Sequence, residues 1–220
     1  MFIGHYSVSF ISKKYEPQIP LWVLFLAVQF VDIIWSLFIF TGIEKATISH
    51  EASGSPLNLI YMPYTHSLLG AIFWSGIAFL IIKYIPILKN RSFKKAIIVS
   101  LAVFSHWLLD VIVHSADLPL WLNNYKIGLG LYDHAFISFS LEVILLLIGF
   151  LFYVAVTSGK KKVGVYGLYI FMIVIILFGI NSVWGIKPPS SQIAAGFLLF
   201  CYIFFAIITA WIEKNRTSTI

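Results

Sequence analysis

The chain has little charge and almost no cysteine. Charged residues make up only 11% of its 220 residues, against about 25% in soluble domains, which excludes an ordinary water-soluble domain. The single cysteine, Cys201, excludes an internal disulfide. Acidic residues number 9 against 15 basic ones, giving a net charge of +6. The basic residues fall in short loops between apolar stretches, so membrane topology explains them and no nucleic-acid partner is expected.

Apolar residues take the place of the missing charge. Hydrophobic side chains make up 60% of the sequence, and several stretches approach or exceed the ~20 residues needed to cross ~30 Å of hydrocarbon. We predict an all-α polytopic bundle in which residues 1–220 form one integral-membrane domain, with membrane lipid as its expected partner. The six predicted transmembrane helices are Leu21–Phe40, Tyr64–Leu88, Ala96–Ser115, Leu131–Thr157, Val163–Trp184 and Ile193–Ile212.

The N-terminal segment Phe2–Ile11 is too short to span. As a helix it would extend only about 15–18 Å, half of a bilayer. It either lies flat at the interface or dips inward as a half-helix with Lys13 and Lys14 at the surface, and we favour the second arrangement. These two lysines follow the apolar patch instead of preceding it, so a cleavable signal peptide is not expected.

The positive-inside rule orients this topology with both termini in the cytoplasm. Under the six-span arrangement, four clusters of basic residues fall on the same side of the membrane. These are Lys13 and Lys14, then Lys89, Arg91, Lys94 and Lys95, then Lys160, Lys161 and Lys162, and finally Lys214 and Arg216.

A polar stripe marks the third predicted span. His106, Asp110 and His114 are four residues apart in an otherwise apolar run, so their side chains lie along one helix face. Ionisable residues inside a membrane are expensive to insert and mark functional sites by default. His106 and Asp110 are one turn apart and can share an ion, whereas His106 and His114 are about 12 Å apart, too far for one metal.

Further ionisable groups come from the other N-terminal spans. Asp32, His66, His134 and Glu142 are expected in the middle or outer half of the membrane, and His5 joins them if its segment dips inward. Inserting Asp32, Asp110 and Glu142 would cost roughly 7–10 kcal/mol in total. A bound divalent cation, of which zinc suits histidine and carboxylate ligands, would compensate this cost.

The expected site therefore lies within residues 1–145, while residues 158–220 contribute two further apolar spans. The expected metal ligands are His5, Asp32, His66, His106 and Asp110.

Each residue also has a structural interpretation. A lone intramembrane histidine is more often a hydrogen-bonded packing residue than a ligand. His66 lies between Thr65 and Ser67, which are ordinary helix-start residues, so this segment could simply cap a helix. Glu142 could be a proton carrier or a structural partner of a nearby histidine.

At these residues the sequence resembles a family of bacterial inner-membrane proteins described as membrane-bound metal-dependent hydrolases and likened to zinc phospholipase C. The resemblance covers roughly residues 4–145 and implies a bacterial inner-membrane location. It differs from many relatives at Gln29, where they have a second acidic residue, and at Pro63-Tyr64, where they have Arg-Gly. The motifs that carry it are Gly4-His5, the apolar run ending at Asp32, Thr65-His66-Ser67, and Ser105-His106 with Asp110.

We therefore expect a metal-dependent hydrolase that acts on a lipid-like ester or phosphoester. His114 or Glu142 would be its general base. Two alternatives stay open: a transporter or non-catalytic membrane subunit that relays protons or cations through the same residues, and a haem-binding subunit with axial histidines. Haem would not require an aspartate one turn from a histidine, so the sequence disfavours the last. The sequence indicates no particular protein partner.

Overall fold

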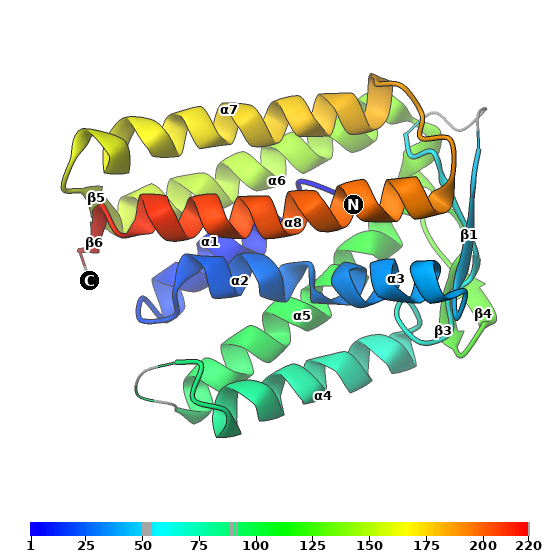
Figure 1. The fold of residues 1–220 in the computed structure, drawn as a ribbon, viewed down its shortest axis with the longest axis horizontal. Helices are drawn as coiled ribbons and strands as arrows, with labels where there is room; N and C mark the ends of the chain where they lie inside the picture. Colours follow the sequence, from blue (N-terminus) through cyan, green and yellow to red (C-terminus); the bar gives the residue numbers. More distant parts are fainter. Residues whose placement is uncertain (50–53, 89, 91, 220) are drawn as a thin grey trace.

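The computed structural model describes residues 1–49, 54–88, 90 and 92–219. In this part the chain folds into a bundle of eight α-helices with three short antiparallel strand pairs (Figure 1). The prediction of a helical bundle is confirmed, but the strand pairs were not expected for an all-α protein. The helices are α1 (Tyr6–Tyr15), α2 (Leu21–Val28), α3 (Phe30–Thr41), α4 (Leu68–Tyr84), α5 (Phe93–Val113), α6 (Ala135–Ala155), α7 (Lys162–Trp184) and α8 (Ser191–Glu213).

Four helices in the described residues, α5 to α8, are long and apolar enough to cross a membrane. A fifth span is formed if α2 and α3 are counted as one, although they are bent by 53°. The remaining predicted span is the 17-residue helix α4, which is only about 25 Å long. The six full-length spans that we predicted are therefore not all present. The second predicted span, Tyr64–Leu88, is shortened at both ends: Ser67 caps α4 at its start, and the helix ends just before Pro86.

The outer surface of the long helices is apolar, as a membrane protein requires. Large hydrophobic side chains are exposed along them, such as Leu101 on α5, Phe136 on α6, Ile170 on α7 and Ile207 on α8. A surface of this kind and extent would drive association in water, whereas lipid tails solvate it without cost. The chain is thus built as an integral membrane protein.

The first predicted span is broken at Gln29, the residue between α2 and α3. The break interrupts the helical hydrogen-bond ladder, so the Val28 carbonyl can accept from a side chain. Asp32 lies in the first turn of α3, where the partial positive charge of a helix N-terminus favours a carboxylate. The break therefore creates two polar groups in the middle of an apolar stretch.

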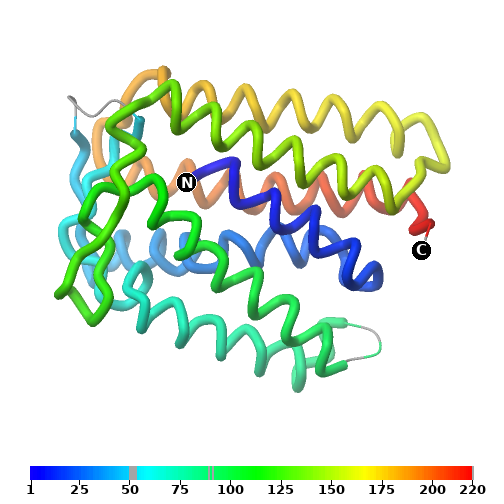
Figure 2. The backbone as a smooth tube through the Cα atoms, turned by 180° about the vertical axis from the view of Figure 1, so that it is seen from behind, coloured from blue at the N-terminus to red at the C-terminus, as the bar shows by residue number. Residues whose placement is uncertain are grey.

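Helix α1 runs inside the bundle from its middle towards the end where the C-terminus lies (Figure 2). Ile3, Tyr6 and Phe10 are fully buried. The N-terminal segment lies within the bundle, which agrees with the inward-dipping arrangement, but Lys13, expected at the surface, is buried. Met1 is buried within the bundle.

The two ends of the bundle differ. At one end, β5 (Thr157–Gly159) pairs with β6 (Arg216–Ser218), and Lys13 of α1 forms an ion pair of 2.7 Å with Glu213 of α8. Of the basic clusters that set the predicted orientation, Lys89 and Arg91 lie outside the described residues. At the other end, two strand pairs cover the helices (Figure 1): β1 (Lys45–Ile48) with β2 (Leu57–Tyr61), and β3 (Leu118–Trp121) with β4 (Asn124–Ile127).

Candidate metal centre

Five polar side chains meet in the interior of the bundle. They form two overlapping groups that share His106, and within each group the potential ligand atoms lie within 4.8 Å of one another. Asp32 is half-buried and the other four are buried. The first group is His5, His106 and Asp110, and the second is Asp32, His66 and His106.

The distances between neighbouring ligand atoms suit a single ion. His106 Nε2 lies 3.1 Å from Asp110 Oδ2 and 3.4 Å from Asp32 Oδ1. His66 Nε2 lies 3.1 Å from the same Asp32 oxygen and 4.0 Å from Asp110 Oδ2. Two ligands at ~2.0–2.1 Å from a tetrahedral metal are about 3.3 Å apart. His106 and the two aspartates are therefore at ligand spacing, and His66 is close to it.

The hydrogen bond made by His106 fixes which of its ring nitrogens is available. Nδ1 lies 2.7 Å from the Val28 carbonyl oxygen at the helix break. A carbonyl can only accept, so Nδ1 carries the proton and donates it. In the neutral ring Nε2 then carries a lone pair. This atom has no hydrogen-bond partner among the described residues.

His66 is fixed in the same way through two further side chains. The Thr65 hydroxyl donates its only proton to Glu44 Oε2 at 2.5 Å, so its oxygen accepts from His66 Nδ1 at 2.8 Å. Glu44 is held in turn because its Oε1 accepts the backbone N–H groups of Tyr64 and Thr65. His66 Nε2 thus carries a lone pair in the neutral ring, directed at the carboxylates.

When the rings of His66 and His106 are neutral, their Nε2 atoms are hydrogen-bond acceptors that face other acceptors, the carboxylate oxygens of Asp32 and Asp110. Two imidazole lone pairs point at the oxygens of Asp32 and Asp110, and such contacts repel unless a proton or a metal cation lies between the atoms. The two carboxylates carry two negative charges, which match a divalent ion, and the imidazoles of His66 and His106 complete a set of four ligands typical of zinc. The residues present therefore fit a metal ion.

Neighbouring groups hold the carboxylates in place. Tyr202 of α8 donates from its hydroxyl to Asp32 Oδ2 at 2.6 Å. Asp110 Oδ1 contacts the amino group of Met1 and lies 3.2 Å from His5 Nε2. The rings of His5 and His106 stack with their centroids 4.0 Å apart. His5 therefore adjoins the set of ligands from the side of α1.

The structure gives Glu142 a positioning role. Its Oε2 accepts three backbone N–H groups, those of Phe2 at 2.8 Å, Ile3 at 2.7 Å and Gly4 at 3.1 Å. These groups precede α1, so the carboxylate satisfies donors near the start of the half-helix and complements its dipole. Glu142 thereby fixes the segment that carries His5, which favours this role over that of general base.

His114, the other expected catalytic residue, lies apart from the ligands but lines the same cavity. Its Nδ1 is 3.2 Å from Asp117 Oδ1, and its ring packs edge-on against Tyr132, with centroids 5.2 Å apart. Burial and the nearby carboxylates of Glu142 and Asp110 raise the pKa of the Tyr132 hydroxyl well above its usual value, so Tyr132 is neutral at pH 7. His134 is exposed and does not join the site.

The cavity beside the cluster has a volume of about 70 Å³, enough for a few water molecules. Asp32, His66 and Asp110 line it together with His114 and Tyr132. The hairpin β1–β2 contributes Leu57 and Leu59 to the wall. The cavity thus gives water molecules room beside the expected metal ligands.

Three important side chains were not identified from the sequence. Tyr202 lies in an apolar span that we expected to contribute nothing, and a tyrosine there looks like a packing residue. Glu44 lies in a polar loop, yet it is only 1% exposed. Thr65 was interpreted only as a helix-start residue, whereas Ser67 accepts from Gly70 N–H and caps α4.

The comparisons with known proteins add no name to this site. No family model matches the chain, and no similar protein was found among curated sequences or solved structures.

Proposed function

We propose that this protein is a membrane-embedded, metal-dependent hydrolase that acts on a lipid-like ester or phosphoester. The observation that carries the proposal is that His66 and His106 both donate from Nδ1 to an oxygen atom and turn Nε2 towards a carboxylate oxygen, of Asp32 and Asp110 respectively, at 3.1 Å. All the motifs behind the resemblance to membrane-bound metal-dependent hydrolases contribute side chains to this cluster. Membership of that family, zinc as the metal and a bacterial inner-membrane location are parts of the proposal.

Different residues of the chain would bind the metal ion and transfer the proton in hydrolysis. A bound divalent ion would supply Lewis acidity, which polarises the scissile group and acidifies water. Asp32, His66, His106 and Asp110 would hold this ion, and His5 contacts Asp110 from the start of α1. His114 lines the cavity near Asp117 and is the candidate general base, because imidazole is the side chain that most often transfers protons in catalysis.

The packing beyond the cluster favours this function over transport. A proton or cation pathway would need polar groups on both sides of the site. Between the cluster and the β5–β6 end, the described residues form an aromatic core in which Phe10 packs against Phe25 and Tyr153, both with ring centroids 5.3 Å away. The water-sized cavity instead lies towards the hairpin end, as expected for a site reached from one side.

Metal analysis of the purified protein tests the proposal. We expect about one zinc-class ion per chain in the wild type and its loss in His106→Ala and Asp110→Ala, with Lys162→Ala on the exposed surface as the control. Turnover of a panel of lipid esters and phosphoesters should disappear on chelation and return when metal is added. Equal trace metal in the wild type and in both site variants would contradict the proposal.

A further inference from the structure

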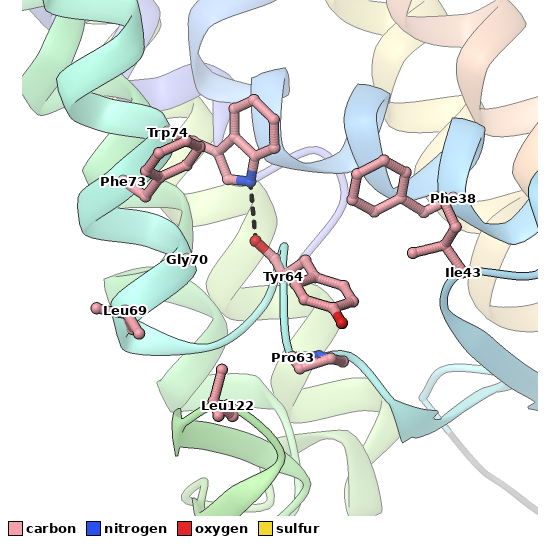
Figure 3. Close-up of a pocket in the computed structure, with 9 residues that line it drawn as sticks. All are labelled: Phe38, Ile43, Pro63, Tyr64, Leu69, Gly70, Phe73, Trp74 and Leu122. Carbon is pink, nitrogen blue, oxygen red and sulfur yellow. Dashed lines mark hydrogen bonds between the residues drawn. The ribbon is translucent and has the colours of Figure 1, made fainter.

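A groove with a volume of about 510 Å³ lies between α3 and α4 (Figure 3); we call it the α3–α4 groove. Its volume falls within the range of about 300–1,000 Å³ that small-molecule sites occupy. None of the described residues that line the groove also lines the metal-site cavity. A molecule bound in the groove would therefore be separate from the metal centre, and its binding does not depend on the proposed hydrolase function.

The lining of the groove is apolar and aromatic. Phe73 and Trp74 of α4 lie on one side of Tyr64, and Phe38 of α3 lies on the other (Figure 3). The Trp74 indole N–H is already donated to the Tyr64 carbonyl at 2.8 Å. The described residues that line the groove carry no charge. A charged group would lose its hydration here without gaining an ion pair, so the groove suits a hydrocarbon.

The groove continues onto the lipid-facing surface of the same two helices. Leu37 and Phe40 of α3 are exposed, and so are Ile72 and Leu80 of α4. Phe73 both lines the groove and belongs to this exposed surface. Large apolar side chains exposed on a membrane helix are solvated by lipid tails. The tails that surround α3 and α4 therefore reach the groove without crossing a polar boundary.

The β3–β4 hairpin contributes Leu122 to one end of the groove (Figure 3). Leu122 and Asn123 form the two-residue loop between Trp121 and Asn124, which are paired in the hairpin. Leu122 has a φ of 48°, in the left-handed region that glycine or asparagine normally occupies in such a loop. A leucine is strained there, and its side chain is exposed. Packing of this side chain against a molecule in the groove would offset the strain.

We propose that the α3–α4 groove holds one acyl chain of a membrane phospholipid. The chain lies on the rings of Phe38, Phe73 and Trp74 and packs against Leu122. Lipid tails elsewhere in the bilayer are as apolar as the groove, so the additional contacts of a concave surface select the chain, and burial from water does not. The head group meets no charge in the described lining and does not contribute to selectivity.

Photo-crosslinking in phospholipid nanodiscs tests where the chain lies. The probe is a phosphatidylcholine with a diazirine in one acyl chain, diluted into unlabelled phosphatidylcholine, and the crosslinks are mapped by mass spectrometry. We expect them to concentrate on Phe38, Phe73, Trp74 and Leu122. A phosphatidylglycerol probe should give the same pattern, because the groove offers no charge to either head group. Crosslinks spread evenly over the lipid-facing helices, or a groove pattern with only one head group, would overturn the proposal.

Native mass spectrometry in detergent measures how many phospholipids stay bound to each chain. We expect one phosphatidylcholine on the wild type. Leu69→Trp places a bulky ring in the groove and should remove both the bound lipid and the groove crosslinks. Leu80→Trp, the same change on the exposed surface of α4 but outside the described lining, should leave both unchanged. Equal loss in the two variants, or a dimer that forms through the groove without bound lipid, would refute the assignment.

A second pair of variants tests the contact made by Leu122. Leu122→Gly removes only the side chain, and glycine suits the left-handed backbone, so the hairpin keeps its shape. Groove crosslinking should fall by about fivefold or more. Tyr125→Gly is the matched control, because Tyr125 also has a positive φ, of 55°, and is exposed but does not line the groove; its crosslinking should equal that of the wild type. Undiminished crosslinking in Leu122→Gly would contradict the proposed packing of the chain.

Discussion

The Thr65→Val substitution isolates the effect of the orientation of His66. Valine has nearly the same shape as threonine, but it removes the oxygen that accepts from His66 Nδ1 at 2.8 Å and the hydroxyl that donates to Glu44 at 2.5 Å. Thr65 is fully buried, so water cannot replace this oxygen. The His66 ring then loses the contact that keeps its Nε2 directed at Asp32.

Loss of such an outer contact typically lowers metal affinity 10- to 100-fold, equivalent to about 1.4–2.7 kcal/mol. We expect Thr65→Val to weaken zinc binding by this factor, measured at pH 7 by competition with a chromophoric chelator, and Thr65→Ser to bind like the wild type because it keeps the hydroxyl. His66→Ala should lose more than either. If Thr65→Val binds zinc as tightly as the wild type while His66→Ala does not, the relay from Glu44 through Thr65 has no part in metal binding.

Three further predictions concern how the half-helix α1 is held. Glu142→Leu leaves three buried N–H groups without an acceptor and should destabilise the protein by roughly 2–4 kcal/mol, seen as a lower Tm in detergent, with Glu142→Gln less affected because its amide oxygen still accepts. Gly149→Ala should also lower Tm, since an added Cβ would lie 2.6 Å from the Ser7 backbone, whereas Gly76→Ala, with nothing within 4 Å, should be neutral or slightly stabilising. Lys13→Met removes one member of a partly buried ion pair and should cost about 1–3 kcal/mol, measured by thermal unfolding; an unchanged Tm would show that this contact does not anchor α1.

The sequence indicates the ligands more clearly than it indicates the helices. His106 and Asp110 are identifiable because two ionisable residues one turn apart are costly to bury in an apolar run. The structure places them with Asp32, His66 and His5 in two overlapping groups that share His106. The helix break at Gln29 could not be predicted from the sequence in this way. Neither proline nor glycine interrupts the run there, and the break depends on a contact from His106, 78 residues away.

Tertiary partners account for the remaining differences as well. Tyr202 is one more aromatic residue in an apolar helix, and only its distance to Asp32, 170 positions earlier, reveals a role. Glu44 lies in a polar loop, where a solvated side chain is the ordinary expectation. Gly42, with a left-handed φ of 74°, ends α3 and turns the chain back, which brings Glu44 under Thr65. These contacts join distant parts of the chain, so no local pattern predicts them.

The dependence of α1 on Glu142 has a consequence for how the protein is made. The amides of Phe2, Ile3 and Gly4 meet their acceptor only after 138 to 140 further positions have been synthesised. Until Glu142 has been synthesised, these three N–H groups lack this acceptor. The segment that carries His5 can therefore take up this position only after α6 has been made, when α5 with His106 and Asp110 is already present.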